Sequence, residues 1–307
     1  MRRLGFTMLE LIFVIVIMGI IGKFGVELLA QAYKSFIFSS VNNTLQANGE
    51  MAVESIASRL QYRIKDSVIA RRSDTFSSFE ALASVPTDPA IAREYNILEW
   101  VATDIEGFRG DLLPYWSGII DLDDSNATLL DSPETNTTAI NNLIQILRPT
   151  ASTTTINNAA IYFIGADSDI KTGYGWDGNA TNITNIINTQ NGSMHPISAL
   201  AIDKFAPTVG SFSGVDVYEY YQLAWTAYAV GIDDYNATGD NTGTLKLWYD
   251  YQPWEGETYK DDAKEVTIME KVSTFQYTAV GSVVKIQVCV NDDLVEDYSL
   301  CKEKTVF

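Results

Sequence analysis

The sequence predicts an α+β fold in which a long N-terminal helix leads into an antiparallel, β-rich head. Residues 6–64 keep apolar side chains at helical spacing, whereas the later apolar runs are short, rich in β-branched and aromatic residues, and separated by polar loops. The charge divides near the same place. Residues 6–72 carry seven basic and five acidic side chains, whereas residues 73–307 carry 12 basic and 34 acidic ones.

Composition excludes several classes of protein. The 307 residues carry a formal net charge of −18, which argues against a sequence-independent grip on nucleic-acid phosphates, so we expect no direct nucleic-acid binding. One histidine and two cysteines argue against a zinc site of Cys and His ligands and against a disulfide-dense scaffold. Neither a nucleophile elbow, a Walker A loop nor a dinucleotide-binding glycine loop is present, so we do not expect an enzyme.

Residues 6–22 form the membrane anchor that the sequence predicts. The run reads FTMLELIFVIVIMGIIG, and it follows the basic leader MRRLG. As a helix it spans about 26 Å, close to the roughly 30 Å of a hydrocarbon core, and Lys23 can snorkel to the interface. Positive charge before the run places the N-terminus in the cytoplasm and the acidic head outside.

Glu10 is unusual because it lies inside this apolar run. A carboxylate at such a depth costs about 2–3 kcal/mol or more unless it finds a partner, so it is a candidate functional residue. A plain signal anchor or a cleaved signal peptide is the alternative. Ala30-Gln31-Ala32 matches the letters of a small-residue cleavage site, but it lies well beyond the apolar run and fits poorly.

The stretch Gly5-Phe-Thr-Met-Leu-Glu-Leu11 resembles the processing motif of type IV prepilins and type II secretion pseudopilins. The resemblance implies that a prepilin peptidase removes residues 1–5 by cutting between Gly5 and Phe6, and that the new Phe6 amine is N-methylated. It also implies that Glu10 pairs with the Phe6 ammonium of a neighbouring pilin in a filament, which turns a costly buried charge into an assembly contact.

The apolar stripe continues after the anchor. We divide the stem into a membrane half, 6–28, and an amphipathic half, 29–72, and expect helix to about residue 70 with weak points near Asn42-Asn43 and Asn48-Gly49. The stretch 53–66 resembles the corresponding helix of J-type minor pseudopilins and W-type minor pilins.

Residues 73–307 are expected to form one head domain of short strands and long loops. Its closing stretch, 271–288, also resembles the J-type and W-type subunits. The expected strands are Tyr95–Val101, Ala159–Ile164, Ser198–Ile202, Val215–Val230, Thr244–Tyr251, Glu265–Tyr277 and Ser282–Val290.

Cys289 and Cys301 flank Asn291-Asp-Asp293, where an antiparallel hairpin would bring them opposite one another. Outside the cytoplasm such a pair can oxidise, so we expect a disulfide; two separate buried thiols are the alternative.

Seven Asn-x-Ser/Thr sequons occur, at Asn42, Asn126, Asn136, Asn179, Asn182, Asn191 and Asn236. Four have an acidic residue two positions before the asparagine, namely Asn126, Asn136, Asn179 and Asn236, whereas the frequency of acidic residues, 39 in 307, predicts about one. This form resembles the extended acceptor sequence of bacterial N-linked oligosaccharyltransferases. Glycosylation is therefore expected at these four, and ordinary polar loops are the alternative.

Metal and acid–base chemistry have little support. His195 has no sequence partner and is expected in a loop. The acidic loops around Asp169 and Asp233–Asn241 offer oxygen ligands for Ca²⁺, but neither has EF-hand spacing, so solvated loops are the preferred interpretation and no cofactor is expected.

These observations lead to one expectation and two alternatives. We expect a minor pilin or pseudopilin, a structural subunit whose partners are the prepilin peptidase, other pilins and inner-membrane lipid. A pilus-tip subunit for adhesion or DNA uptake is the second possibility, and an anchored periplasmic hydrolase is the third.

Overall fold

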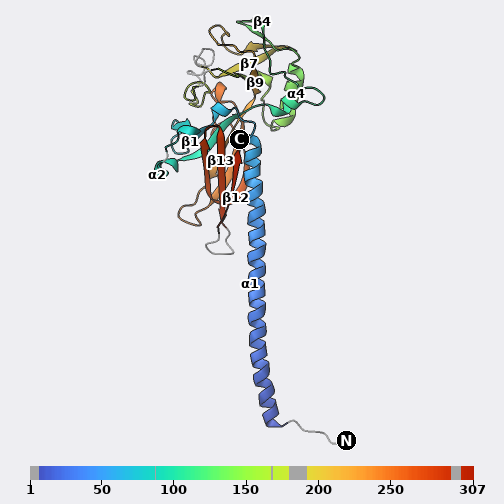
Figure 1. Cartoon of the computed structure of the whole chain (residues 1–307), viewed down its shortest axis with the longest axis vertical. Coiled ribbons are helices and arrows are strands. Elements are labelled where there is room, and N and C mark those ends of the chain that lie inside the picture. The colour runs from blue at the N-terminus through green and yellow to red at the C-terminus, as the bar shows by residue number, and fades with distance from the viewer. Residues whose placement is uncertain (1–6, 87, 167–168, 180–191, 292–298) are drawn as a thin grey trace.

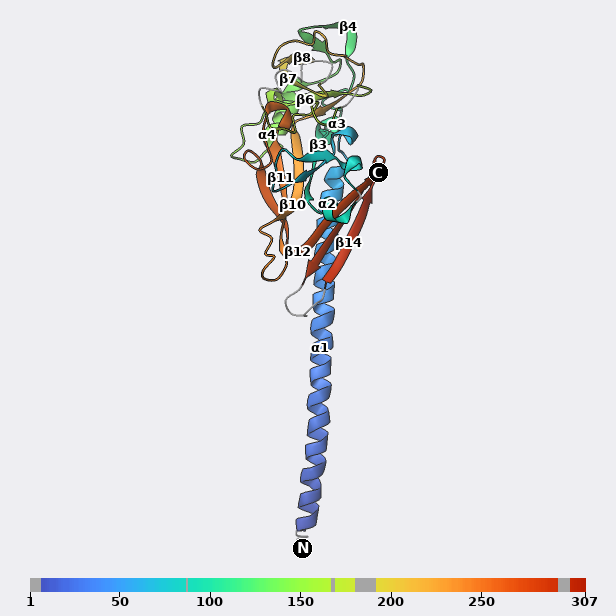
Figure 2. The ribbon, with the colours of Figure 1, turned by 90° about the vertical axis from the view of Figure 1, so that its left-hand side faces the viewer.

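The computed structural model describes residues 7–86, 88–166, 169–179, 192–291 and 299–307. It confirms the α+β prediction: a long helix at the N-terminus is followed by an eight-stranded and a six-stranded sheet, both antiparallel throughout their described pairings (Figure 1). The helix projects away from the head, and the six-stranded sheet lies at the end of the molecule farthest from the N-terminus (Figures 1 and 2).

Helix α1 (Met8–Leu60) has 53 residues and is about 80 Å long. It runs unbroken through Asn42-Asn43 and Asn48-Gly49, so the expected weak points are wrong, because packing of the helix against the head offsets their low helix propensity. The expected end near residue 70 is also wrong. At Leu60 the carbonyl accepts from Arg63 Nη1 at 2.8 Å, and the backbone N–H of Ile64 already bonds the carbonyl of Val101 in the sheet at 2.9 Å.

The other elements are shorter. The helices are α2 (Pro89–Ala92), α3 (Ile105–Arg109) and α4 (Thr137–Leu147), and the 3-10 turns are η1 (Lys65–Ser67), η2 (Leu82–Ser84), η3 (Ile156–Asn158) and η4 (Pro253–Glu255). The strands are β1 (Ile69–Arg72), β2 (Phe79–Ala81), β3 (Tyr95–Ala102), β4 (Asp121–Asn126), β5 (Leu129–Asp131), β6 (Ala160–Phe163), β7 (Met194–Ala201), β8 (Lys204–Pro207), β9 (Tyr221–Ala224), β10 (Thr226–Asp233), β11 (Gly243–Tyr251), β12 (Lys264–Val280), β13 (Val283–Asn291) and β14 (Ser299–Val306).

The eight-stranded sheet has the order β14-β13-β12-β11-β10-β3-β1-β2, and the C-terminal half of α1 packs on one face of it (Figure 2). The resulting first core contains apolar side chains from both the helix and the sheet. Those from the helix recur mostly every three or four residues, and most of those from the strands recur every two residues. Its helical members are Val41, Leu45, Ala52, Val53, Ile56, Ala57 and Leu60.

Strand β3 is buried on both faces, which places it at the centre of the head. Leu98 and Trp100 face the first core, whereas Ile97 and Val101 belong to a second core on the opposite face. Strand β6 alternates in the same way. Ala160 and Tyr162 belong to the second core, whereas Ile161 and Phe163 belong to a third core that includes Ile140 and Ile144 of α4. The six-stranded sheet, in the order β4-β5-β8-β7-β6-β9, is therefore joined to the first sheet by shared apolar packing.

Most expected strands are confirmed in position. Tyr95–Val101, Thr244–Tyr251 and Glu265–Tyr277 coincide closely with β3, β11 and β12. The single strand expected over 215–230 is wrong, because the chain leaves β9 at Trp225 and enters β10 in the other sheet.

Candidate functional site

The N-terminal half of α1 is the candidate functional site. From Met8 to Ser40 none of its side chains is buried, and this part of the helix extends about 50 Å from the head (Figure 2). Among the described residues, α1 is the one helix long and apolar enough to cross a membrane, and its most apolar window makes no buried contact within the chain. The chain therefore has the architecture of a single-pass membrane protein with a β-rich head.

The exposed apolar surface is longer than a membrane requires. Beyond Lys23 a polar stripe of Lys23, Glu27, Gln31 and Lys34 follows one side of the helix at four- and three-residue spacing. The other sides stay apolar, and they include Phe24, Tyr33 and Phe36, which are 66 %, 66 % and 71 % exposed. About 30 Å of helix fills a hydrocarbon core, which corresponds to α1 up to about residue 28. Between there and the head, apolar side chains such as Tyr33 and Phe36 remain exposed in the chain.

Glu10 lies in the first turn of α1, where it completes a capping box with Thr7. Its Oε2 accepts from the Thr7 N–H at 2.9 Å and from the Thr7 hydroxyl at 2.8 Å, and the Glu10 N–H donates to the Thr7 hydroxyl at 3.4 Å. This local role was not predicted above, although Thr-x-x-Glu ahead of an apolar run is the signature of a capping box. Gly5 and Phe6, the expected cleavage and methylation sites, lie outside the described residues.

The stem is fixed to the head by charge as well as by apolar packing. Lys304 on β14 pairs with Glu54 of α1, and Lys302 Nζ lies 3.6 Å from Glu50 Oε2 one helical turn earlier. These pairs lie on the edge strand of the sheet, where lysines also discourage pairing with a foreign strand. These two ion pairs therefore add to the apolar packing that joins the helix to the head.

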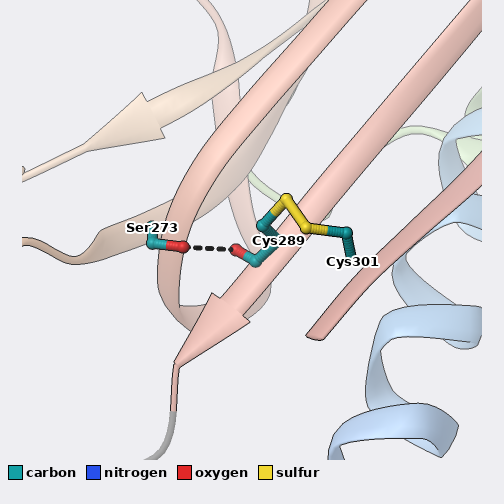
Figure 3. Close-up of a disulfide and its surroundings, with 3 residues drawn as sticks. All are labelled: Ser273, Cys289 and Cys301. Carbon is teal, nitrogen blue, oxygen red and sulfur yellow. Dashed lines mark hydrogen bonds between the residues drawn. A yellow bond between two sulfur atoms is a disulfide. The ribbon is translucent and has the colours of Figure 1, made fainter. Parts of the chain in front are cut away.

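The expected disulfide is present. Cys289 on β13 and Cys301 on β14 are directly opposite in the antiparallel register, and their sulfurs are bonded (Figure 3). The carbonyl of Cys289 also accepts a hydrogen bond of 3.2 Å from the Ser273 hydroxyl on β12. The bridge thus closes the C-terminal hairpin, which carries the lysines that hold the stem.

The four acid-preceded sequon asparagines, Asn126, Asn136, Asn179 and Asn236, are exposed on separate parts of the head. Asn126 ends β4, Asn136 caps α4, and Asn236 lies in the β10–β11 connection. They do not form a common site.

The expected loop position of His195 is wrong: it lies on β7, is 2 % exposed, and packs its ring 5.4 Å from that of Phe163. The acidic loops are closed by their own hydrogen bonds. Asp169 accepts from the Lys171 N–H and the Thr172 hydroxyl, both at 2.9 Å. Within the described ranges, no three His, Cys, Asp or Glu side chains gather as a metal-binding set.

Comparison of the chain with protein-family models, curated proteins and solved structures finds no match.

Proposed function

We propose that the chain is a minor pilin or pseudopilin, a non-enzymatic subunit of a type IV pilus or a type II secretion pseudopilus. The observation that carries the proposal is the exposed apolar surface of α1 between about residue 28 and the head, which includes Tyr33 and Phe36. An isolated chain leaves this surface in water, whereas parallel helices packed in a filament core would cover it. Burying one Phe or Leu side chain contributes about 1.5–3 kcal/mol, so several such residues supply a strong assembly force.

Glu10 sets the register of this packing. Its Oε2 is occupied by Thr7, but Oε1 accepts no hydrogen bond from the described residues and is available to an incoming ammonium group. After a prepilin peptidase cuts between Gly5 and Phe6, the N-methylated Phe6 amine of an adjoining subunit supplies that cation. Before assembly, the capping-box hydrogen bonds lower the cost of holding the carboxylate in the membrane. After assembly, the intermolecular ion pair favours one axial offset between the two neighbouring helices.

The N-terminus lies in the cytoplasm before processing, α1 is held in the inner membrane, and the head lies outside. The disulfide supports this placement, because such bonds persist in oxidising compartments. A tip-located adhesion subunit is the second candidate, favoured by the six-stranded sheet at the end of the molecule farthest from the membrane. The 34 acidic side chains after residue 72 weigh against a DNA-binding version of that role.

The deciding experiment is mass spectrometry of the N-terminal peptide of the protein from its native membrane and sheared-filament fractions. We expect the mature chain to begin with N-methylated Phe6. A Gly5→Leu variant should keep residues 1–5 and stay out of filaments, whereas the neighbouring Leu4→Ala control should be processed and incorporated. A wild-type protein that begins at Met1, or after Ala32, would contradict the proposal.

A further inference from the structure

Three of the four acid-preceded sequons have a geometry that leaves the acceptor nitrogen open. At Asn126, Asn136 and Asn236 the carboxamide oxygen is engaged within the chain, but the Nδ2 donates no hydrogen bond to any described residue. All three side chains are exposed, as are the threonines two positions later, Thr128, Thr138 and Thr238. In each case the oxygen is therefore held by the chain, while the nitrogen has no hydrogen-bond partner among the described residues; at Asn236 this nitrogen lies against Gly239.

Asn126 shows the arrangement most clearly. It lies at the tight turn between β4 and β5, where it pairs with Leu129. Its Oδ1 accepts from both the N–H and the hydroxyl of Thr128, each at 2.9 Å, so the asparagine and the sequon hydroxyl are already linked in an Asx turn. The exposed Asp124 precedes them.

The other positions are also turns or helix starts. Asn136 Oδ1 accepts from the Ala139 N–H at 2.9 Å as the N-cap of α4, and Asn236 Oδ1 accepts from the Thr238 hydroxyl at 3.4 Å. The acids ahead of them, Glu134 and Asp234, have left-handed backbone, with φ of 62° and 52°. This backbone turns the chain sharply just before each acceptor.

Asn42 provides an internal contrast. This sequon lies within α1, where the Thr44 hydroxyl donates to the Ser40 carbonyl at 3.0 Å instead of to its asparagine. It has no acid two positions earlier, and helical backbone does not allow the turn seen at Asn126.

We propose that the exported head is N-glycosylated at Asn126, Asn136 and Asn236 by an oligosaccharyltransferase that recognises the carboxylate two residues before the acceptor; the sequon that begins at Asn179 extends outside the described residues. The donor class is an oligosaccharide linked to a polyprenyl diphosphate. Nδ2 forms a bond to C1 of the first sugar, the C1–O bond to the diphosphate breaks, and the diphosphate leaves with the electron pair. Nδ2 gives one proton to a base of the transferase. Since transfer requires export, the inference rests on that part of the proposed function.

The test uses full-length protein from its native cells, digested and analysed for glycopeptides. We expect glycan on Asn126, Asn136 and Asn236 and none on Asn42. In an Asp124→Ala variant, occupancy at Asn126 should fall to background while Asn136 and Asn236 stay occupied. The matched control is Asp123→Ala, which removes the adjacent exposed charge and leaves the sequon and its acid intact, so Asn126 should stay glycosylated.

The N-terminal peptide and the Cys289–Cys301 thiols are measured in the same samples. If all three asparagines are bare while the chain begins at Phe6 and the disulfide is oxidised, the glycosylation inference is overturned and the filament proposal stands. If they are bare, the chain begins at Met1 and the thiols are free, export fails and both are overturned. Equal occupancy of Asn126 with and without Asp124 would overturn recognition of the carboxylate.

Discussion

Arg71 on β1 and Glu99 on β3 form an ion pair in the middle of the head, with each side chain only 1 % exposed. The Arg71 Nη2 also donates to the Trp176 carbonyl at 2.8 Å, and the Tyr251 hydroxyl donates to Glu99 Oε2 at 3.0 Å. Burial, with the Glu99 charge nearby, raises the pKa of Tyr251 well above its usual value and keeps the hydroxyl a donor. The pair thus joins β1 and β3 of the first sheet. Its remaining hydrogen bonds connect these strands to Trp176 and Tyr251, whose side chains belong to the second core.

Removing one partner of this pair is expected to be far more damaging than removing both. Arg71→Met leaves Glu99 buried without a cation, which costs about 3–5 kcal/mol of unfolding free energy. The double variant Arg71→Met/Glu99→Leu should recover a large part of that loss. Urea unfolding of the detergent-solubilised chain measures both. A single variant as stable as the wild type would show that the pair is not held in the interior as described.

A pH-dependent stability term is expected from Asp104, which caps α3 by accepting from the Gly107 N–H at 3.2 Å. Burial raises the pKa of this carboxyl from 3.8 to about 6 in the folded state. Its stabilising contribution is therefore complete below about pH 4 and is lost as pH rises through about 6.

Asp104→Asn removes this dependence. Relative to wild type, the variant should gain about 1–3 kcal/mol of unfolding free energy between pH 4 and pH 7, as followed by urea unfolding across that range. A pH-independent difference for Asp104→Asn would contradict the assignment.

The Cys289–Cys301 bridge should stabilise the hairpin that holds the stem. The two cysteines are 12 residues apart, and a loop of this size gains about 2–3 kcal/mol from closure. Cys289→Ala/Cys301→Ser should lose about that much in denaturant unfolding. Reductant should destabilise the wild type by a similar amount and leave the double variant unchanged. If reductant also lowered the unfolding free energy of the double variant, the destabilisation could not be assigned to the disulfide.

The stem-and-head architecture could be predicted because its signals are local. An apolar run, a helical stripe and short β-branched segments each report on their own element. The disulfide could also be predicted, because Cys289 and Cys301 lie close together in the sequence on the two strands of one hairpin. The end of α1 could not be predicted this way, because Ile64 bonds to Val101, far along the chain, and that contact appears only when the sheet forms.

Other misses have separate causes. Helix α4 was not predicted, although it has a regular apolar face on which Ile140 and Ile144 are buried. Its N-cap, Asn136, was considered only as a glycosylation sequon. The capping box of Thr7 and Glu10 was not predicted, because Glu10 was considered only as a charge inside a membrane. The Arg71–Glu99 pair joins residues 28 positions apart, which no local pattern indicates.

Filament packing of the stem is tested most directly by photocrosslinking from Phe36 in native cells. A photoreactive phenylalanine analogue at Phe36, in the apolar surface, should form adducts with a chain whose own sequence carries a prepilin leader motif. The same analogue at Lys34, in the polar stripe on the opposite side of the helix, should give few or none. Adducts from Lys34 alone, or no protein adduct from Phe36 in assembled material, would contradict the account.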